Sequence, residues 1–164
     1  MAVDTVRWLD SLEMRAWRSL LVAHARVLSR LDDELLASNS MSVADYGVLV
    51  NLSEAEGGRM RMSELADRLL LSPSGLTRRL DGLVASGLVE RTKCPTDRRG
   101  AYALLTETGR QRLEEVAPRH VEQVRRNFID RLERSQLEAL CDALGVIAEA
   151  PCGGEAGALG DSPA

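Results

Sequence analysis

Apolar residues recur at steps of three and four along the first part of the chain, the spacing of one face of an α-helix. The pattern predicts one long helix from about residue 8 to residue 36. At 1.5 Å per residue it would extend roughly 40 Å, more than a small domain needs internally. The stripe consists of Leu9, Leu12, Trp17, Leu20, Leu21, Leu28, Leu31 and Leu35. We expect the excess length to pack against a second copy of the chain; an ordinary core helix is the alternative.

Start and stop signals divide the next segment into two helices and a short strand. Ser42 and Asp45 form an S-x-x-D cap for a second helix, which we expect to end at the following pair of glycines. Residues 59–62 alternate in polarity and predict a brief strand. Ser63 is expected to cap a third helix over residues 64–70.

A helix-turn-helix and a hairpin are predicted next. Ser72 is a suitable N-cap and Pro73 suits the first helical position, because its missing N–H would be unpaired there. Gly87 can adopt the left-handed conformation that ends this fourth helix. Residues 88–92 and 101–105 predict two strands around a turn rich in Pro, Asp and Gly. A hairpin that directly follows a helix-turn-helix is a wing.

The remainder is predicted to be helical up to a disordered tail. Thr106 caps one helix, and Ser135 with Glu138 forms a capping box for the last, on whose apolar stripe Cys141 is expected to be buried. The predicted fold class is mainly α with a small β-hairpin wing. Residues 1–38 and 106–150 are assigned to a helical dimerisation region from the N- and C-terminal helices, residues 39–105 to a winged helix-turn-helix lobe, and residues 151–164 to a disordered tail.

The fourth helix carries the residues that favour DNA binding. Leu76, Leu80 and Leu83 mark its buried face. The residues turned outward or to the flank are Ser72, Ser74, Thr77, Arg78, Arg79 and Asp81. Small hydroxyl side chains let a backbone approach the major groove, and arginine can bind guanine with two hydrogen bonds. A merely solvated polar face is the alternative for this helix.

Local charge supports the same hypothesis although the whole chain carries a net charge of −4. The segment 59–112 contains 11 Arg or Lys and 6 Asp or Glu, a balance of +5, which leaves −9 for the remainder. Phosphate binding depends on this local field rather than on the total charge. The sequence therefore predicts a basic module within an acidic protein.

The hairpin turn adds a second basic surface. Lys93, Arg98 and Arg99 lie on it, and Asp97 stands beside the two arginines. An arginine at a wing tip can enter the narrow minor groove, where the negative potential is strongest. A charged turn that only keeps the hairpin soluble is the alternative. Two basic surfaces in this order favour double-stranded DNA as the partner.

Several strings in this order resemble the MarR family of multiple-antibiotic-resistance regulators. They are M-S-E-L-A-D-R-L from Met62, S-P-S-G-L-T-R-R-L-D-G-L from Ser72, G-L-V-E-R from Gly87, C-P-T-D-R-R-G from Cys94 and L-T-E-T-G from Leu105. The resemblance covers about residues 9–148 and implies a homodimer that binds a pseudo-palindromic operator, usually as a repressor. It also implies that Arg99 enters the minor groove while Asp97 steadies it.

The resemblance further implies a small aromatic or drug-like effector in the cleft between the dimer helices and the DNA-binding lobe. Trp17, His24, Arg26 and Tyr46 are the candidate lining residues, since they combine apolar bulk with polar tips. Ordinary core or dimer packing is the alternative for each of them. Cys94 at the wing base is a candidate for redox sensing, with a passive turn cysteine as its alternative.

Other classes of protein are disfavoured. The chain has no Gly-rich phosphate loop, G-x-S-x-G or H-E-x-x-H string, so we expect no enzyme and no cofactor. Its two histidines and three cysteines lack metal-site spacing, so no metal is expected. No apolar run is long enough for a membrane span, and no signal peptide is apparent, which favours a cytoplasmic protein. A winged-helix module that binds protein instead of DNA remains the alternative function.

Overall fold

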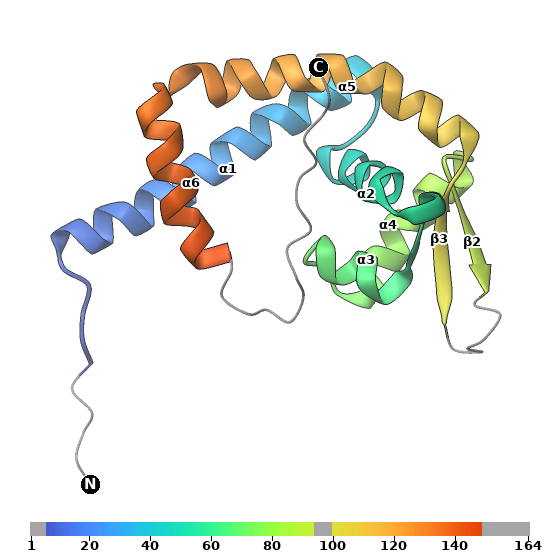
Figure 1. Ribbon diagram of the computed structural model, residues 1–164, viewed down its shortest axis with the longest axis horizontal. Helices are drawn as coiled ribbons and strands as arrows, with labels where there is room; N and C mark the ends of the chain where they lie inside the picture. The colour runs from blue at the N-terminus through green and yellow to red at the C-terminus, as the bar shows by residue number, and fades with distance from the viewer. Residues whose placement is uncertain (1–5, 94–99, 149–164) are drawn as a thin grey trace, which may run out of the picture.

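Amphipathic helices from the two ends of the chain lie together, and the middle of the chain folds as a lobe beneath them (Figure 1). The computed structural model describes residues 6–93 and 100–148. The helices are α1 (Ser11–Asn39), α2 (Val43–Glu54), α3 (Met62–Arg68), α4 (Pro73–Ala85), α5 (Glu107–Asn127) and α6 (Arg134–Ala148), with 3-10 turns η1 (Glu56–Gly58) and η2 (Ile129–Arg131). The strands are β1 (Arg59–Arg61), β2 (Val89–Lys93) and β3 (Ala101–Leu105). The predicted fold class, mainly helical with a small wing, is confirmed.

Helix α1 begins later than predicted because Asp10 caps it. The Asp10 carboxylate accepts hydrogen bonds from the backbone N–H groups of Leu12, at 2.7 Å, and Glu13, at 2.9 Å. The Glu13 carboxylate in turn accepts from the Asp10 N–H at 2.9 Å, which completes a capping box. The helix ends at Ser40, whose backbone is left-handed with φ of 51°. The helix thus extends slightly beyond the predicted end near residue 36.

Three predicted N-caps are confirmed around the lobe. The side-chain oxygens of Ser42, Ser72 and Thr106 each accept a hydrogen bond from the backbone N–H three residues later, at 3.0, 3.1 and 2.9 Å. Each bond satisfies one of the N–H groups that a helix start leaves unpaired. Gly87 has φ of +72° and follows the end of α4, as predicted.

The cap predicted at Ser63 is wrong, because the third helix begins at Met62, two residues earlier than predicted. Strand β1 leads directly into α3, and no side-chain hydrogen bond caps the start of that helix. The strand is held by pairing instead: β1 and β2 both pair antiparallel with β3, in the order β1-β3-β2. The wing hairpin is therefore one part of a three-stranded sheet.

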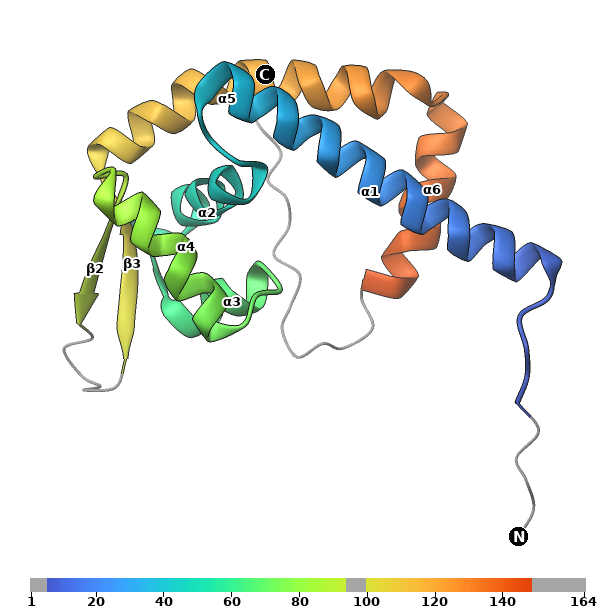
Figure 2. The same cartoon turned by 180° about the vertical axis from the view of Figure 1, so that it is seen from behind.

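Two predictions for the last helix are also wrong. The helix starts at Arg134 rather than after Ser135, and the Gln136 side chain accepts a hydrogen bond from the Glu133 N–H at 2.9 Å. Cys141 is exposed in the single chain, and α6 contains no buried residue. In both views α6 turns away from the end of α5 at a steep angle (Figures 1 and 2). Its apolar residues therefore find no core within one copy of the chain.

The hydrophobic core belongs mainly to the lobe. Its buried members come from the α1–α2 connection, α2, α3, α4, the three strands and the first half of α5: Met41, Val48, Leu49, Leu52, Met60, Leu65, Ala66, Leu76, Leu80, Leu83, Val89, Ala103, Leu105 and Leu113. Removing a leucine side chain from water contributes about 1.5–3 kcal/mol, so this cluster determines how α4 is placed. Helix α1 adds only Leu31 and Leu35 to the buried set.

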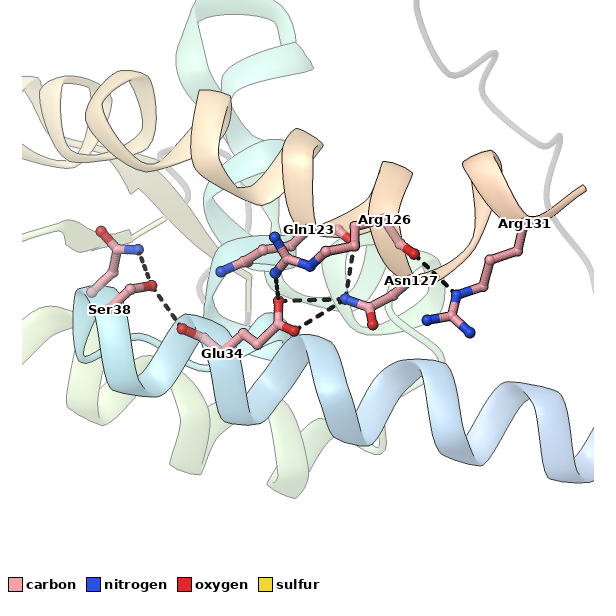
Figure 3. Close-up of polar contacts among 7 residues, drawn as sticks. Glu34, Ser38, Gln123, Arg126, Asn127 and Arg131 are labelled. Atoms are coloured by element: carbon pink, nitrogen blue, oxygen red, sulfur yellow. Dashed lines mark hydrogen bonds and ion pairs between the residues drawn. The ribbon is translucent and has the colours of Figure 1, made fainter.

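Polar contacts join α1 to α5 (Figure 3). The Glu34 carboxylate accepts from Arg126 at 2.7 Å and from the Asn127 amide at 3.3 Å, where the two helices lie side by side. Nearer the lobe, the Arg112 guanidinium donates to the backbone carbonyl of Asn39 at the end of α1. These contacts fix the C-terminal part of α1 to α5 near both ends of α5.

Gly109 allows α5 to start against the end of the helix-turn-helix. A Cβ at this position would overlap the Leu88 carbonyl oxygen and lie 2.8 Å from a methyl carbon of Leu105.

We expect Gly109→Ala to lower the free energy of unfolding by about 1–3 kcal/mol, since the backbone has to move. Gly82→Ala is the control, because nothing lies within 4 Å of a Cβ there. Helix propensity predicts that it stabilises the protein by about 0.5–1 kcal/mol. Urea unfolding of both variants measures the difference, and equal stabilities would contradict the close approach.

Candidate nucleic-acid interface

The N-terminus of α4 presents serine hydroxyl groups to solvent. Ser72 and Ser74 are exposed, and their hydroxyl oxygens are 3.2 Å apart. Pro73 occupies the first turn, which contains no acidic residue. The positive end of the helix dipole favours an anion at this point, and the serine hydroxyl groups can donate hydrogen bonds to it. This end of the helix is therefore suited to a phosphate group.

The exposed face of α4 lies opposite its buried leucines, as predicted. Leu76, Leu80 and Leu83 are buried, whereas Thr77 and Arg78 are exposed. Thr77 donates its hydroxyl to the Pro73 carbonyl at 2.9 Å, which keeps that side chain close to the helix. Within residues 6–93 and 100–148, Arg78 has no hydrogen bond or ion pair. Its five N–H donors are thus free for an external acceptor.

Arg79 is placed differently from its neighbours. Its guanidinium lies 3.0 Å from the Asp45 carboxylate and 3.4 Å from the Ser42 hydroxyl, both at the start of α2. The Arg79 and Asp45 side chains are 29% and 30% exposed, so the pair is partly shielded from water. The sequence placed Arg79 on the flank of the helix, and the structure turns it toward α2. The contact ties α4 to the start of α2.

Arg91 joins the wing to α4, a role that the sequence analysis missed. Its guanidinium donates to the Thr77 carbonyl at 2.7 Å and lies 2.8 Å from the Asp81 carboxylate. The alternation of side chains along a strand could have predicted this role. Arg91 is two residues after the buried Val89, so both lie on the inward face of β2. Asp81, expected on the outward face, is thereby engaged within the protein.

The basic residues of the wing are only partly described. Lys93 is exposed at the end of β2, one step before the turn. Asp97, Arg98 and Arg99 lie outside the described residues, as does Cys94. Their predicted contacts with the minor groove therefore stay predictions.

The four candidate ligand residues are not brought together in the single chain. Trp17, His24 and Arg26 are exposed on α1. Tyr46 is half-buried on α2, with its ring centre 4.4 Å from that of His120 on α5. Burial raises the pKa of Tyr46, with the Glu54 charge adding to the effect, and burial lowers the pKa of His120. Both rings are thus held in their neutral forms at the junction of lobe and helical layer.

Two further observations bear on partners. Within the described part of the chain, no group of three or more His, Cys, Asp or Glu residues could hold a metal ion. None of the helices there is long and apolar enough to cross a membrane.

The Arg91 contacts predict a testable link between wing and helix. Arg91→Gln should raise the rate of amide hydrogen exchange in β2 and lower the free energy of unfolding by about 1 kcal/mol, because a partly exposed ion pair and a charged hydrogen bond are lost. Glu90→Gln is the control, since Glu90 lies next in sequence on the opposite, exposed face of β2. Exchange rates that respond equally to both changes would contradict the anchoring role.

The chain is similar to known proteins both in sequence and in structure. The MarR family model matches residues 39–100. AbsC, a MarR family transcriptional regulator from Streptomyces coelicolor, is 43% identical, with 88% of this chain and 97% of AbsC covered and a TM-score of 0.81. Sco3205, a MarR family transcriptional regulator from the same organism solved in complex with DNA, is 36% identical, with 93% and 96% covered and a TM-score of 0.85.

A curated relative agrees over a shorter stretch. The HTH-type transcriptional repressor YetL of Bacillus subtilis (strain 168) is 28% identical over 100 residues, which are 61% of this chain and 60% of YetL. The match thus spans about three fifths of that relative. The two Streptomyces structures, in contrast, align over nearly their whole length and share the winged helix-turn-helix described above. The chain belongs to the MarR family of transcriptional regulators.

Proposed function

We propose that the protein is a homodimeric transcriptional regulator that binds double-stranded DNA at a pseudo-palindromic operator. The observation that carries the proposal is the exposed face of α4, where Arg78 has no partner within the described residues and stands beside a hydroxyl-capped helix N-terminus. Such a helix places arginine at base edges while its N-terminus binds phosphate. Sco3205, which is 36% identical, was solved in complex with DNA.

The residues of the surface take different parts in this proposal. Ser72, Ser74 and Thr77 bind the backbone near the major groove, and Arg78 contacts bases. Arg79 is assigned to positioning, because its charge is engaged by Asp45. Lys93, Asp97, Arg98 and Arg99 form the wing that reaches the minor groove, as the family resemblance implies.

Unburied apolar surface supports a dimer. On α1, Leu12 is 65% exposed, Trp17 52% and Leu21 47%, and on α6 Val146 and Ile147 are exposed. Contiguous apolar patches of this kind mark association surfaces. Two-fold symmetry then presents two copies of α4, and half-sites about 34 Å apart fit one turn of B-DNA.

Repression is the direction we propose for the regulation, since YetL is named a repressor. We further propose release by a small aromatic or drug-like effector. The half-buried pair of Tyr46 and His120 lies where the lobe meets α5, and a ligand there would act by favouring one spacing of the two lobes. It stays a prediction that Trp17, His24 and Arg26 line the effector site. A redox role for Cys94 also stays a prediction.

Binding to DNA from upstream of the protein's own gene, measured by fluorescence anisotropy over a salt series, tests the proposal. Arg78→Ala should weaken binding by about 1–3 kcal/mol for each half-site, the contribution of a bidentate arginine–guanine contact. Arg15→Ala is the control, because it removes the same charge from an exposed site on α1. If the wild type binds no DNA specifically, the alternative of a protein-binding winged-helix module gains support.

The dimer is tested separately by placing a charge on the apolar stripe of α1. Leu21→Asp should convert the dimer to monomer in analytical ultracentrifugation, because a carboxylate cannot be buried unpaired at an apolar interface. Leu21 is 47% exposed in the single chain, so the fold of each copy should survive the change. Ser29→Asp, exposed on the polar side of α1 between Arg26 and Asp32, should leave the mass unchanged. A Leu21→Asp protein that remains dimeric would place the interface elsewhere.

A further inference from the structure

The turn between α3 and α4 carries the most exposed large apolar side chain in the described part of the chain. Leu70 is 87% exposed. Its neighbours Leu69 and Leu71 are partly buried and pack against the core of the lobe. The backbone on both sides is therefore anchored, and the turn holds the Leu70 side chain out in water.

The backbone of the turn is strained at the same residue. The Leu70 N–H donates to the Asp67 carbonyl at 3.1 Å, and the Leu71 N–H donates to the Ala66 carbonyl at 2.8 Å. These two hydrogen bonds form a Schellman motif, which ends α3 and requires one residue in the left-handed conformation. That residue is usually glycine, but here it is Leu70, with φ of +52°. A Cβ in this conformation lies close to the following carbonyl oxygen, so leucine is disfavoured there.

Neither the strain nor the exposure of Leu70 helps the chain to fold. Glycine would remove both, because it adopts the left-handed conformation without strain and has no apolar side chain to expose. Strained residues persist where the surrounding structure holds them, and they gather at functional sites. Because the turn leads directly into α4, the neighbouring functional surface is the one proposed for DNA.

Hydroxyl groups lie close to Leu70 at the start of α4. Ser72 is the N-cap of this helix, and its hydroxyl oxygen is 3.2 Å from that of Ser74. Two residues of extended chain span at most about 7 Å, so the Cα atom of Leu70 lies within that distance of the Cα atom of Ser72. If this helix end binds a phosphate, the leucine side chain can therefore reach the adjoining nucleotide.

DNA fits these surroundings better than a second protein does. On the α3 side, the residues near Leu70 are the exposed Asp67 and Arg68, and Arg68 is paired with Glu64 at 3.1 Å. A specific protein interface buries about 800 Å² on each partner around an apolar centre, which one leucine among polar residues does not supply. DNA combines phosphates with isolated apolar groups, namely the thymine methyl group in the major groove and the carbon atoms of the sugar.

We propose that Leu70 makes an apolar contact with DNA, beside the phosphate bound at the N-terminus of α4, and thereby contributes to operator recognition. The inference rests on the proposed DNA-binding function and adds to it a contact that does not depend on charge. Because the turn already holds the leucine in place, little backbone entropy is lost when the contact forms. The apolar group on the DNA is a thymine methyl or a sugar, and the two are separated by the test.

The test begins with Leu70→Gly in the full chain and the operator found by footprinting upstream of the protein's own gene. The variant should melt at a higher temperature than the wild type, because the strain is removed. It should bind the operator about three- to tenfold more weakly, the effect of losing one or two methyl-sized apolar contacts. The slope of log affinity against log salt should stay unchanged, since no phosphate contact is lost.

Two further variants separate the apolar contact from the strain. Leu70→Asn keeps a side chain that tolerates the left-handed conformation but makes it polar, so it should weaken binding as Leu70→Gly does. Ser40→Gly is the matched control, because Ser40 is also exposed and left-handed, with φ of +51°, but lies at the end of α1. It should raise the melting temperature and leave the affinity for the operator unchanged.

Substituted DNA identifies the group that Leu70 touches. Each thymine of the operator is replaced in turn by uracil, which lacks only the methyl group. If the contact is with a methyl group, one replacement should weaken wild-type binding and have no further effect on Leu70→Gly, as expected for two groups in contact. If every replacement affects both proteins equally while Leu70→Gly still binds more weakly, the contact is with a sugar.

Four outcomes would overturn the inference, and they differ in what they say about the proposed function. A Leu70→Gly protein that binds the operator as tightly as the wild type would remove the contact while DNA binding stands. Weaker binding with a shallower salt slope would mean that the change acts through phosphate contacts. A variant that becomes monomeric in analytical ultracentrifugation would assign Leu70 to the interface between two copies. Wild-type protein that binds no DNA specifically would overturn both proposals.

Discussion

The orientation of α4 depends on the burial of its three leucines against the rest of the lobe. Leu76, Leu80 and Leu83 follow one another at steps of four and three, so they occupy one face of the helix and enter the common core. Because that core is close-packed, the helix cannot rotate without opening a cavity. The face that carries Thr77 and Arg78 is therefore fixed toward solvent. The orientation of the surface that we propose for DNA binding is thus a consequence of apolar packing on the other side of the helix.

Polar contacts around this core set the positions of the neighbouring parts. Arg91 fastens β2 to α4, and Arg79 fastens α4 to the start of α2. Both pairs are partly exposed, so each contributes little to global stability, and their effect is mainly to restrict the geometry. The start of α5 approaches the lobe closely enough that only glycine fits at position 109. If the spacing between α1 and α5 changed, the lobe would consequently move with α5 as well as with α2.

The helical layer is the part of the single chain that is least complete. Helix α1 buries Leu31 and Leu35 near the lobe and leaves most of its apolar stripe exposed, and α6 buries nothing. The apolar stripe of α1 thus divides into two parts. One part belongs to the core of the single chain, and the other is exposed to solvent there. The expectation that Cys141 lies in a core failed for this reason: its face of α6 is not covered within one copy.

Local signals in the sequence determined the order of the elements, the caps at Ser42, Ser72 and Thr106, and the two faces of α4, because each depends on a few neighbouring residues. The caps at Ser63 and Ser135 were misplaced, since strand pairing and the Gln136 side chain determined those helix starts. Which charged groups pair within the protein was decided only by the tertiary structure. Arg79 and Arg91 are engaged by other residues, whereas Arg78 has no partner within residues 6–93 and 100–148. This difference could not be predicted from neighbouring residues, because contacts between residues 14 or 34 positions apart depend on how the helices pack.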